Sequence, residues 1–157
     1  MIAGSPKLLI QAFGQSFPKA FLFLGLTILR LGEVMYYILV IDDEKEILDI
    51  IKISLSKAGY KVETALDGQK GIKKLDNGQF DLVITDINMP RLDGRKVVEY
   101  IRNSNRSCTP VIGISGTPWL LKDSPFDAVF TKPFPLTDLA NSVRHLIMQV
   151  GSDCDLI

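Results

Sequence analysis

From residue 36 onward, short apolar or alternating segments take turns with amphipathic segments. The short segments are rich in β-branched residues and are bounded by polar or turn residues, which is typical of strands. They cover residues 36–41, 61–66, 82–84, 111–114 and 128–131. In the intervening and final segments, apolar residues recur at helical spacing. The predicted helices cover residues 47–55, 69–75, 97–101 and 136–148.

This alternation predicts a single α/β domain over residues 35–150. Strands that alternate with helices form parallel sheets through right-handed crossovers. We therefore expect a doubly wound, five-stranded parallel sheet with helices on both faces. The composition agrees, because 46% hydrophobic and 23% charged residues in a chain of 157 are ordinary for one globular domain. Residues 151–157 are expected to form a flexible tail.

Residues 1–34 form an N-terminal extension that lacks this alternation and contains an apolar block over residues 20–29. Ten residues are too few to span a bilayer as a helix. Three interpretations remain open. The protein starts at Met35, or the extension tethers it to a membrane or a partner, or the extension is a removed or disordered leader.

Charge and cysteine content narrow the function further. Eighteen basic residues balance eighteen acidic ones, so overall charge gives no argument for binding nucleic acid or an anionic membrane. Cys108 and Cys154 match no metal-ligand spacing and do not suggest a disulfide framework. We therefore expect a reducing, cytoplasmic setting.

Polar residues whose side chains can react or bind ligands follow four of the predicted strands. They are Asp42, Asp43, Asp86, Ser115 and Lys132. Because the carboxyl ends of parallel strands meet at one edge of a sheet, we expect these side chains to converge. Crowded carboxylates repel one another unless a cation neutralises them, and oxygen donors suit Mg²⁺. A carboxylate nucleophile, a cation, a lysine and a hydroxyl are the groups that an aspartyl phosphate requires.

Together, the motifs resemble the receiver domain of two-component response regulators, of the stand-alone, chemotaxis-regulator-like type. The resemblance covers residues 36 to about 149. The motifs that carry it are Asp42-Asp43, Asp86 with Asn88-Met89-Pro90, Ser115-Gly116 and Lys132-Pro133-Phe134. Their order and their gaps match the family.

The resemblance implies that Asp86 accepts a phosphoryl group from a histidine kinase or a phosphotransfer protein. It implies that Ser115 and Lys132 contact the phosphoryl oxygens. It also implies that the Lys132-Pro133 peptide bond is cis.

The same resemblance implies a Mg²⁺ site. Asp43 and Asp86 would bind the ion directly, Asn88 through its backbone carbonyl, and Asp42 through a metal-bound water. An alternative for Asp42 or Asp43 is to cap the helix that follows, where the positive end of the helix dipole favours an acid.

Two features depart from the family. Only sixteen residues separate Ser115 from Lys132, and they include Pro118 and Pro125, so we expect a short or irregular fourth helix there. The position that commonly carries an aromatic switch residue is Val129. Phe130 is adjacent, but strand alternation points it to the other face.

The leading hypothesis is a single-domain response regulator that is phosphorylated in a Mg²⁺-dependent reaction and signals through a protein–protein surface. No output domain follows in the sequence, so we expect no direct contact with nucleic acid. We do not expect an enzyme beyond self-phosphorylation from small phosphodonors and autodephosphorylation. The alternative is a receiver-fold interaction module without phospho-switching. A phosphatase of the haloacid dehalogenase type would carry a second acid at position 88, which is Asn.

Overall fold

The computed structural model describes residues 35–117 and 125–153, with side chains up to residue 149. The strands are β1 (Tyr37–Ile41), β2 (Lys61–Ala65), β3 (Leu82–Asp86), β4 (Val111–Ser115) and β5 (Ala128–Thr131). The helices of the described part are α2 (Lys45–Lys57), α3 (Gly68–Asn77), α4 (Gly94–Arg102) and α5 (Leu136–Asp153).

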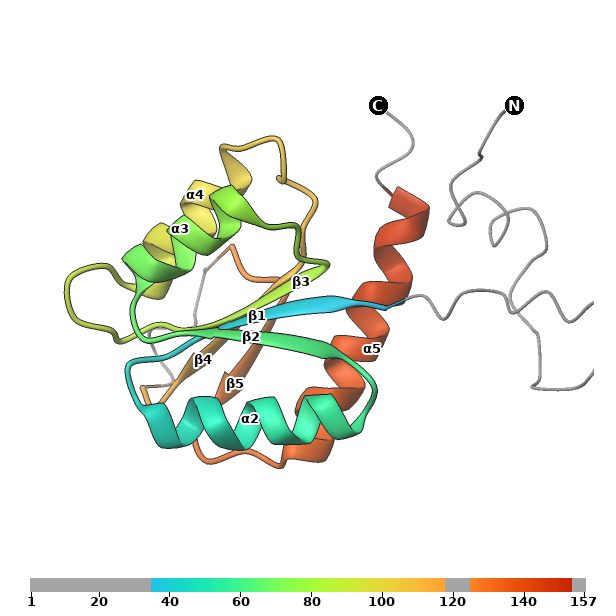
Figure 1. Cartoon of the computed structure of the whole chain (residues 1–157), viewed down its shortest axis with the longest axis horizontal. Coiled ribbons are helices and arrows are strands. Elements are labelled where there is room, and N and C mark those ends of the chain that lie inside the picture. Colours follow the sequence, from blue (N-terminus) through green and yellow to red (C-terminus); the bar gives the residue numbers. More distant parts are fainter. Residues whose placement is uncertain (1–34, 118–124, 154–157) are drawn as a thin grey trace, which may run out of the picture. The chain divides into compact units, whose positions relative to one another are not determined.

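The five strands form one parallel sheet in the order β2-β1-β3-β4-β5. Helices α3 and α4 cover one face, while α2 and α5 cover the other (Figure 1). The predicted doubly wound α/β fold is therefore confirmed. Its chain reversal lies between β1 and β3, at the point where such sheets hold their ligands.

Two apolar cores fill the space between the sheet and its helices. Successive strand residues point to opposite faces, so each central strand supplies both cores. Under α2 and α5 the buried residues include Ile38, Val40, Leu55, Ile84, Ile114 and Val143. Under α3 and α4 they include Leu39, Ile41, Leu75, Val83, Val97 and Val111. Burial on both faces explains why β1, β3 and β4 are continuous apolar runs in the sequence.

Strand register aligns the carboxyl ends of the sheet. Ile41 pairs with Thr85, Asp86 pairs with Ile114, and Ser115 pairs with Thr131. Asp86 and Ser115, which end their strands, and the residues that directly follow Ile41 and Thr131 thus lie at one edge. This is the edge at which the sequence predicts the functional side chains.

Helix α5 ends later than predicted, and two predicted segments fall outside the described residues. Helix α5 runs to Asp153, beyond the predicted end at residue 148, so the first residues of the predicted flexible tail are helical. The predicted short fourth helix falls on residues 118–124, and the N-terminal extension on residues 1–34. Both lie outside the described residues. Within the described residues, no helix combines the length and apolarity needed to span a bilayer.

The prediction for the cysteines was wrong at Cys108, which is disulfide-bonded. The disulfide could not be foreseen, because sequence spacing does not reveal which thiols the fold brings together. Cysteine usage therefore no longer indicates a reducing setting.

The predicted alternation along β5 is confirmed. Phe130 packs against the core under α2 and α5, and its ring lies 5.4 Å from that of Phe134. Val129 points the other way and is 44% exposed. On the α3 and α4 face, the ring of Phe126 lies over Gly113 of β4, where a β-carbon would come within 2.8–3.0 Å of three ring atoms. A glycine is therefore required in β4 to seat this ring.

We expect Gly113→Ala to lower the free energy of unfolding by about 1–3 kcal/mol, because the added methyl overpacks against Phe126. Urea unfolding measures this loss. The double variant Gly113→Ala/Phe126→Leu should recover part of it. Gly116→Ala is the matched control, since a β-carbon at Gly116 meets no atom of the described residues within 4 Å. Equal stability of Gly113→Ala and the control would contradict the packing argument.

Candidate functional site

Asp86 is the last residue of β3 and has a buried carboxylate, 4% exposed. Asp42 directly follows β1, and Lys132 directly follows β5. The ammonium nitrogen of Lys132 lies 2.9 Å from Oδ1 of Asp86 and 3.0 Å from Oδ2 of Asp42. The structure thus brings together three of the predicted site residues, which are far apart in the sequence.

Asp42 is held by the backbone on both sides. Its N–H donates to the Ala65 carbonyl at 3.1 Å, which continues the pairing of β1 with β2. Its Oδ1 accepts from the Glu44 N–H at 2.9 Å, and its Oδ2 accepts from Lys132. Asp42 therefore orders the turn into α2 and also binds the site lysine, although the N-cap residue of α2 is Glu44. Asp42 thus stands two positions before the N-cap rather than at it, and its predicted Mg²⁺ contact through water stays a prediction.

Ser115 lies at the end of β4, completely buried, with its backbone carbonyl accepting from the Lys132 N–H at 2.9 Å. Its Oγ accepts from the Thr117 N–H at 3.0 Å. The Thr117 hydroxyl in turn accepts from the Asn88 side-chain amide at 3.1 Å. Hydrogen bonds thus connect the segment after Asp86 with the segment after Ser115.

Asp43 and Asn88 are less closely engaged. Both side chains are exposed, and no hydrogen bond or ion pair joins Asp43 to another described residue. Asn88 follows Asp86 by two positions, so its backbone carbonyl belongs to the same loop. Of the residues predicted to converge, Asp42, Asp86 and Lys132 therefore contact one another through the lysine, and Asp43 does not join them.

The loop between β3 and α4 is fixed by close backbone contacts. Gly94 donates its N–H to the Ile87 carbonyl at 3.1 Å, and a β-carbon there would collide with the Asp86 carbonyl. Arg91 adopts a left-handed conformation with φ 70°, and its guanidinium lies 3.4 Å from the buried Asp67 carboxylate. This loop follows Asp86 directly, so these contacts fix the backbone around the buried carboxylate.

Residues 38–144 match the response regulator receiver domain family. The chain belongs to this family. Within the receiver domain, the Lys132-Pro133 peptide bond is cis, as the resemblance implied.

Curated relatives include two transcriptional regulators. The chain is 31% identical over 120 residues to the alkaline phosphatase synthesis transcriptional regulatory protein PhoP of Bacillus subtilis. It is 34% identical over 116 residues to the DNA-binding dual master transcriptional regulator RpaA of Synechocystis. Each match covers 70% of this chain and 48% of the relative. The chain thus spans about half the length of these relatives.

Solved structures with the same fold include two that the receiver domain covers almost completely. The response regulator TrrA of Thermotoga maritima, in complex with Mg(2+)-BeF, superposes with a TM-score of 0.67 at 33% identity, over 71% of this chain and 99% of TrrA. The chemotaxis response regulator CheY4 of Vibrio cholerae gives a TM-score of 0.66 at 29% identity, over 71% and 98% of the two chains.

The receiver domain holds its buried charges at an electrostatic cost. Burial raises the pKa of Asp42 above its ordinary value, against the lowering effects of the Glu44 amide and Lys132, and the negative charge of Asp86 adds to the rise. Burial alone would lower the pKa of Lys132, but its hydrogen bonds to Asp86 and Asp42 raise that pKa instead. The two partners thus differ. The ion pair stabilises the charged form of Lys132, whereas the more deeply buried Asp42 carboxylate loses more free energy by desolvation than it gains from its partners.

The donor set fits a hard cation by its chemistry. Two buried carboxylates share one ammonium and leave net negative charge at the edge, and the nearby backbone and side-chain donors are also oxygens. Oxygen donors of this kind suit Mg²⁺. Within the described residues, however, no three acidic, histidine or cysteine side chains already form a metal-binding cluster. The exposed Asp43 is the predicted ligand that stands apart.

Glu44 also contacts the site lysine, which the sequence did not predict. Its Oε1 lies 3.2 Å from the ammonium nitrogen of Lys132. The signal was present, because three acids follow β1 in succession, but spacing alone does not show which of them turns toward the lysine.

We expect Asp42→Asn to raise the free energy of unfolding near pH 7, without divalent metal, by on the order of 1 kcal/mol. The amide keeps an acceptor for the Glu44 N–H and removes a buried charge. Because the pKa of Asp42 is raised, the folded protein takes up a proton before the unfolded chain does. The contribution of Asp42 to the free energy of unfolding of the wild type therefore increases as the pH falls. The increase takes place between the pKa of Asp42 in the folded protein and its ordinary value of 3.8.

The advantage of Asp42→Asn should accordingly shrink as the pH is lowered, which urea unfolding in the presence of a chelator measures. Asp49→Asn, on the exposed side of α2, removes the same charge and is the control. A variant less stable than both the wild type and the control near pH 7 would contradict this account.

Proposed function

We propose that the receiver domain accepts a phosphoryl group on Asp86 in a Mg²⁺-dependent reaction. The observation that carries this proposal is the contact of 2.9 Å between the Lys132 ammonium and Oδ1 of the buried Asp86. A buried carboxylate with an ammonium beside it is suited to accept a phosphoryl group, because the ammonium can neutralise the added negative charge.

In the proposed reaction, a carboxylate oxygen of Asp86 attacks the phosphorus of the phosphodonor. The bond between phosphorus and the leaving group breaks, and the leaving group takes its electron pair. The Lys132 ammonium then pairs with a phosphoryl oxygen instead of Oδ1. Ser115 can donate its hydroxyl hydrogen to another phosphoryl oxygen while its Oγ still accepts from the Thr117 N–H.

Asp43, Asp86 and the Asn88 carbonyl would hold Mg²⁺, with Asp42 acting through a bound water. The ion would neutralise charge on the transferring group and on the crowded carboxylates. The all-oxygen donor set supports this assignment. Asp43 has no competing contact with a described residue, so it is free to turn toward Asp86.

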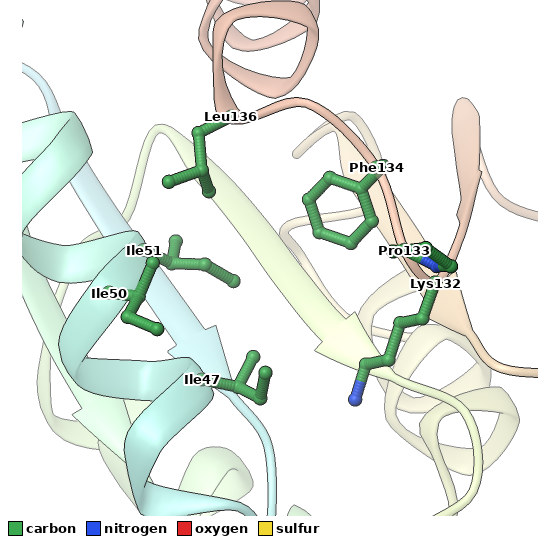
Figure 2. A pocket seen from close by; sticks show the side chains of 7 residues that line it. All are labelled: Ile47, Ile50, Ile51, Lys132, Pro133, Phe134 and Leu136. Carbon is green, nitrogen blue, oxygen red and sulfur yellow. The ribbon is translucent and has the colours of Figure 1, made fainter.

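The phosphodonor is proposed to be a histidine kinase or a phosphotransfer protein. An apolar groove of about 480 Å³ lies beside the site, between α2 and the segment that joins β5 to α5 (Figure 2). It is lined by Ile47, Ile50, Ile51, Lys132, Pro133, Phe134 and Leu136. Because Lys132 belongs to this lining and also contacts Asp86, a protein seated in the groove can present a phosphohistidine to Asp86.

The receiver domain is proposed to pass its signal to a downstream protein through a surface biased by phosphorylation. The balanced charge of the chain gives no support for direct binding to nucleic acid. The alternative, an interaction module without phospho-switching, is disfavoured by the intact contacts of Lys132 with Asp86 and Asp42.

We expect the wild-type protein incubated with acetyl phosphate and Mg²⁺ to gain one phosphoryl group that is stable in acid and labile in base. Intact-mass analysis measures this gain. Asp86→Ala should gain none, and a chelator should prevent the gain in the wild type. Asp76→Ala, which removes an exposed acid from α3, is the control. A wild type without the adduct, or the same adduct on Asp86→Ala, would end the proposal.

We expect Ile50→Glu to slow phosphoryl transfer from a phosphohistidine protein by about tenfold relative to the rate with acetyl phosphate, because a charge enters the apolar groove. Ile53→Glu is the matched control, since Ile53 is exposed on the same helix but does not line the groove. Transfer is followed by loss of label from the donor. Equal ratios for the two variants would contradict docking in the groove.

A further inference from the structure

Glu44 is a third carboxylate bound to Lys132, and it differs from the other two in exposure. The side chain of Glu44 is 61% exposed, whereas those of Asp42 and Asp86 are 2% and 5% exposed. Its Oε1 lies 3.2 Å from the lysine nitrogen. Lys132 is therefore shared between two fixed, buried partners and one partner at the surface.

The start of α2 does not depend on a hydrogen bond from the Glu44 side chain. Glu44 is the N-cap residue, yet its side chain makes no capping hydrogen bond. The turn is held through its backbone, because its N–H donates to Asp42 and its carbonyl accepts from the Leu48 N–H at 3.2 Å. Removing the charge at Glu44 thus leaves the helix start intact.

We propose that Glu44 selects against small, highly charged phosphodonors and so slows the reaction of Asp86 with free acyl phosphates. This inference rests on the proposed function of Asp86. The carboxylate competes with the incoming phosphoryl oxygens for Lys132, and it also repels an anion that approaches the mouth of the site. Both effects grow with the negative charge of the phosphodonor.

Two small phosphodonors distinguish this effect from a general change in reactivity. With acetyl phosphate, a dianion near neutral pH, the phosphorus–oxygen bond breaks and acetate leaves with the electron pair. With phosphoramidate, a monoanion whose nitrogen is already protonated, the phosphorus–nitrogen bond breaks and ammonia leaves. Removing one nearby carboxylate should therefore favour acetyl phosphate more than phosphoramidate.

The test measures phosphorylation rates of the full chain with each donor at saturating Mg²⁺. We expect Glu44→Gln to raise the rate with acetyl phosphate about fivefold and with phosphoramidate about twofold. The gain should shrink at high ionic strength, because salt screens an exposed charge. Glu46→Gln removes the same charge from the first turn of the same helix, and it should change neither rate by more than about 1.5-fold.

Equal rates for Glu44→Gln and Glu46→Gln, or equal gains with both donors, would overturn the inference while leaving the phosphoacceptor role of Asp86 in place. A wild type that takes a phosphoryl group from neither donor would overturn the proposed function, and this inference with it.

Discussion

The receiver domain depends on one electrostatic arrangement: two buried carboxylates, Asp42 and Asp86, bound to a single ammonium, Lys132. Each carboxylate alone would be costly to bury, and together they also repel one another. Lys132 offsets part of this cost but not all of it, because burial still raises the pKa of Asp42. The edge of the sheet therefore keeps residual negative charge that a further cation can neutralise.

The backbone is what allows such unfavourable neighbours to stay in place. Strand register sets Asp86 beside β4, and the close approach of Gly94 to the Asp86 carbonyl fixes the loop that follows. Two separate apolar cores hold the sheet from both faces. The stability that these cores supply lets the domain carry a charge cluster that does not itself favour folding.

The sequence predicts the fold and the convergence of the site for the same reason. Each functional residue lies at the carboxyl end of a predicted strand or directly after it, so parallel topology alone brings Asp86 and Lys132 together. The apolar pattern alone could not separate Asp42 from Asp43, and only the family resemblance gave them different roles, because adjacent identical acids differ only in the direction in which the backbone turns them. The hydrogen bond from the Asp42 N–H to β2 makes that choice. The contact of Glu44 with Lys132 and the disulfide of Cys108 depend on neighbours in the folded structure. Sequence spacing does not predict such neighbours.

The arrangement around Lys132 also explains how one site can combine rigidity with response. Asp42 and Asp86 are fixed by the sheet, while Glu44 is held to the lysine only at the surface. A phosphoryl group on Asp86 would bring new oxygens to the lysine, and the exposed Glu44 contact is the one whose loss costs least. Lys132 can therefore move from its resting partners to the phosphoryl group with no change in the strands. In the proposed switch, the rearrangement would involve the turn into α2 and the segment after β5, which border the apolar groove.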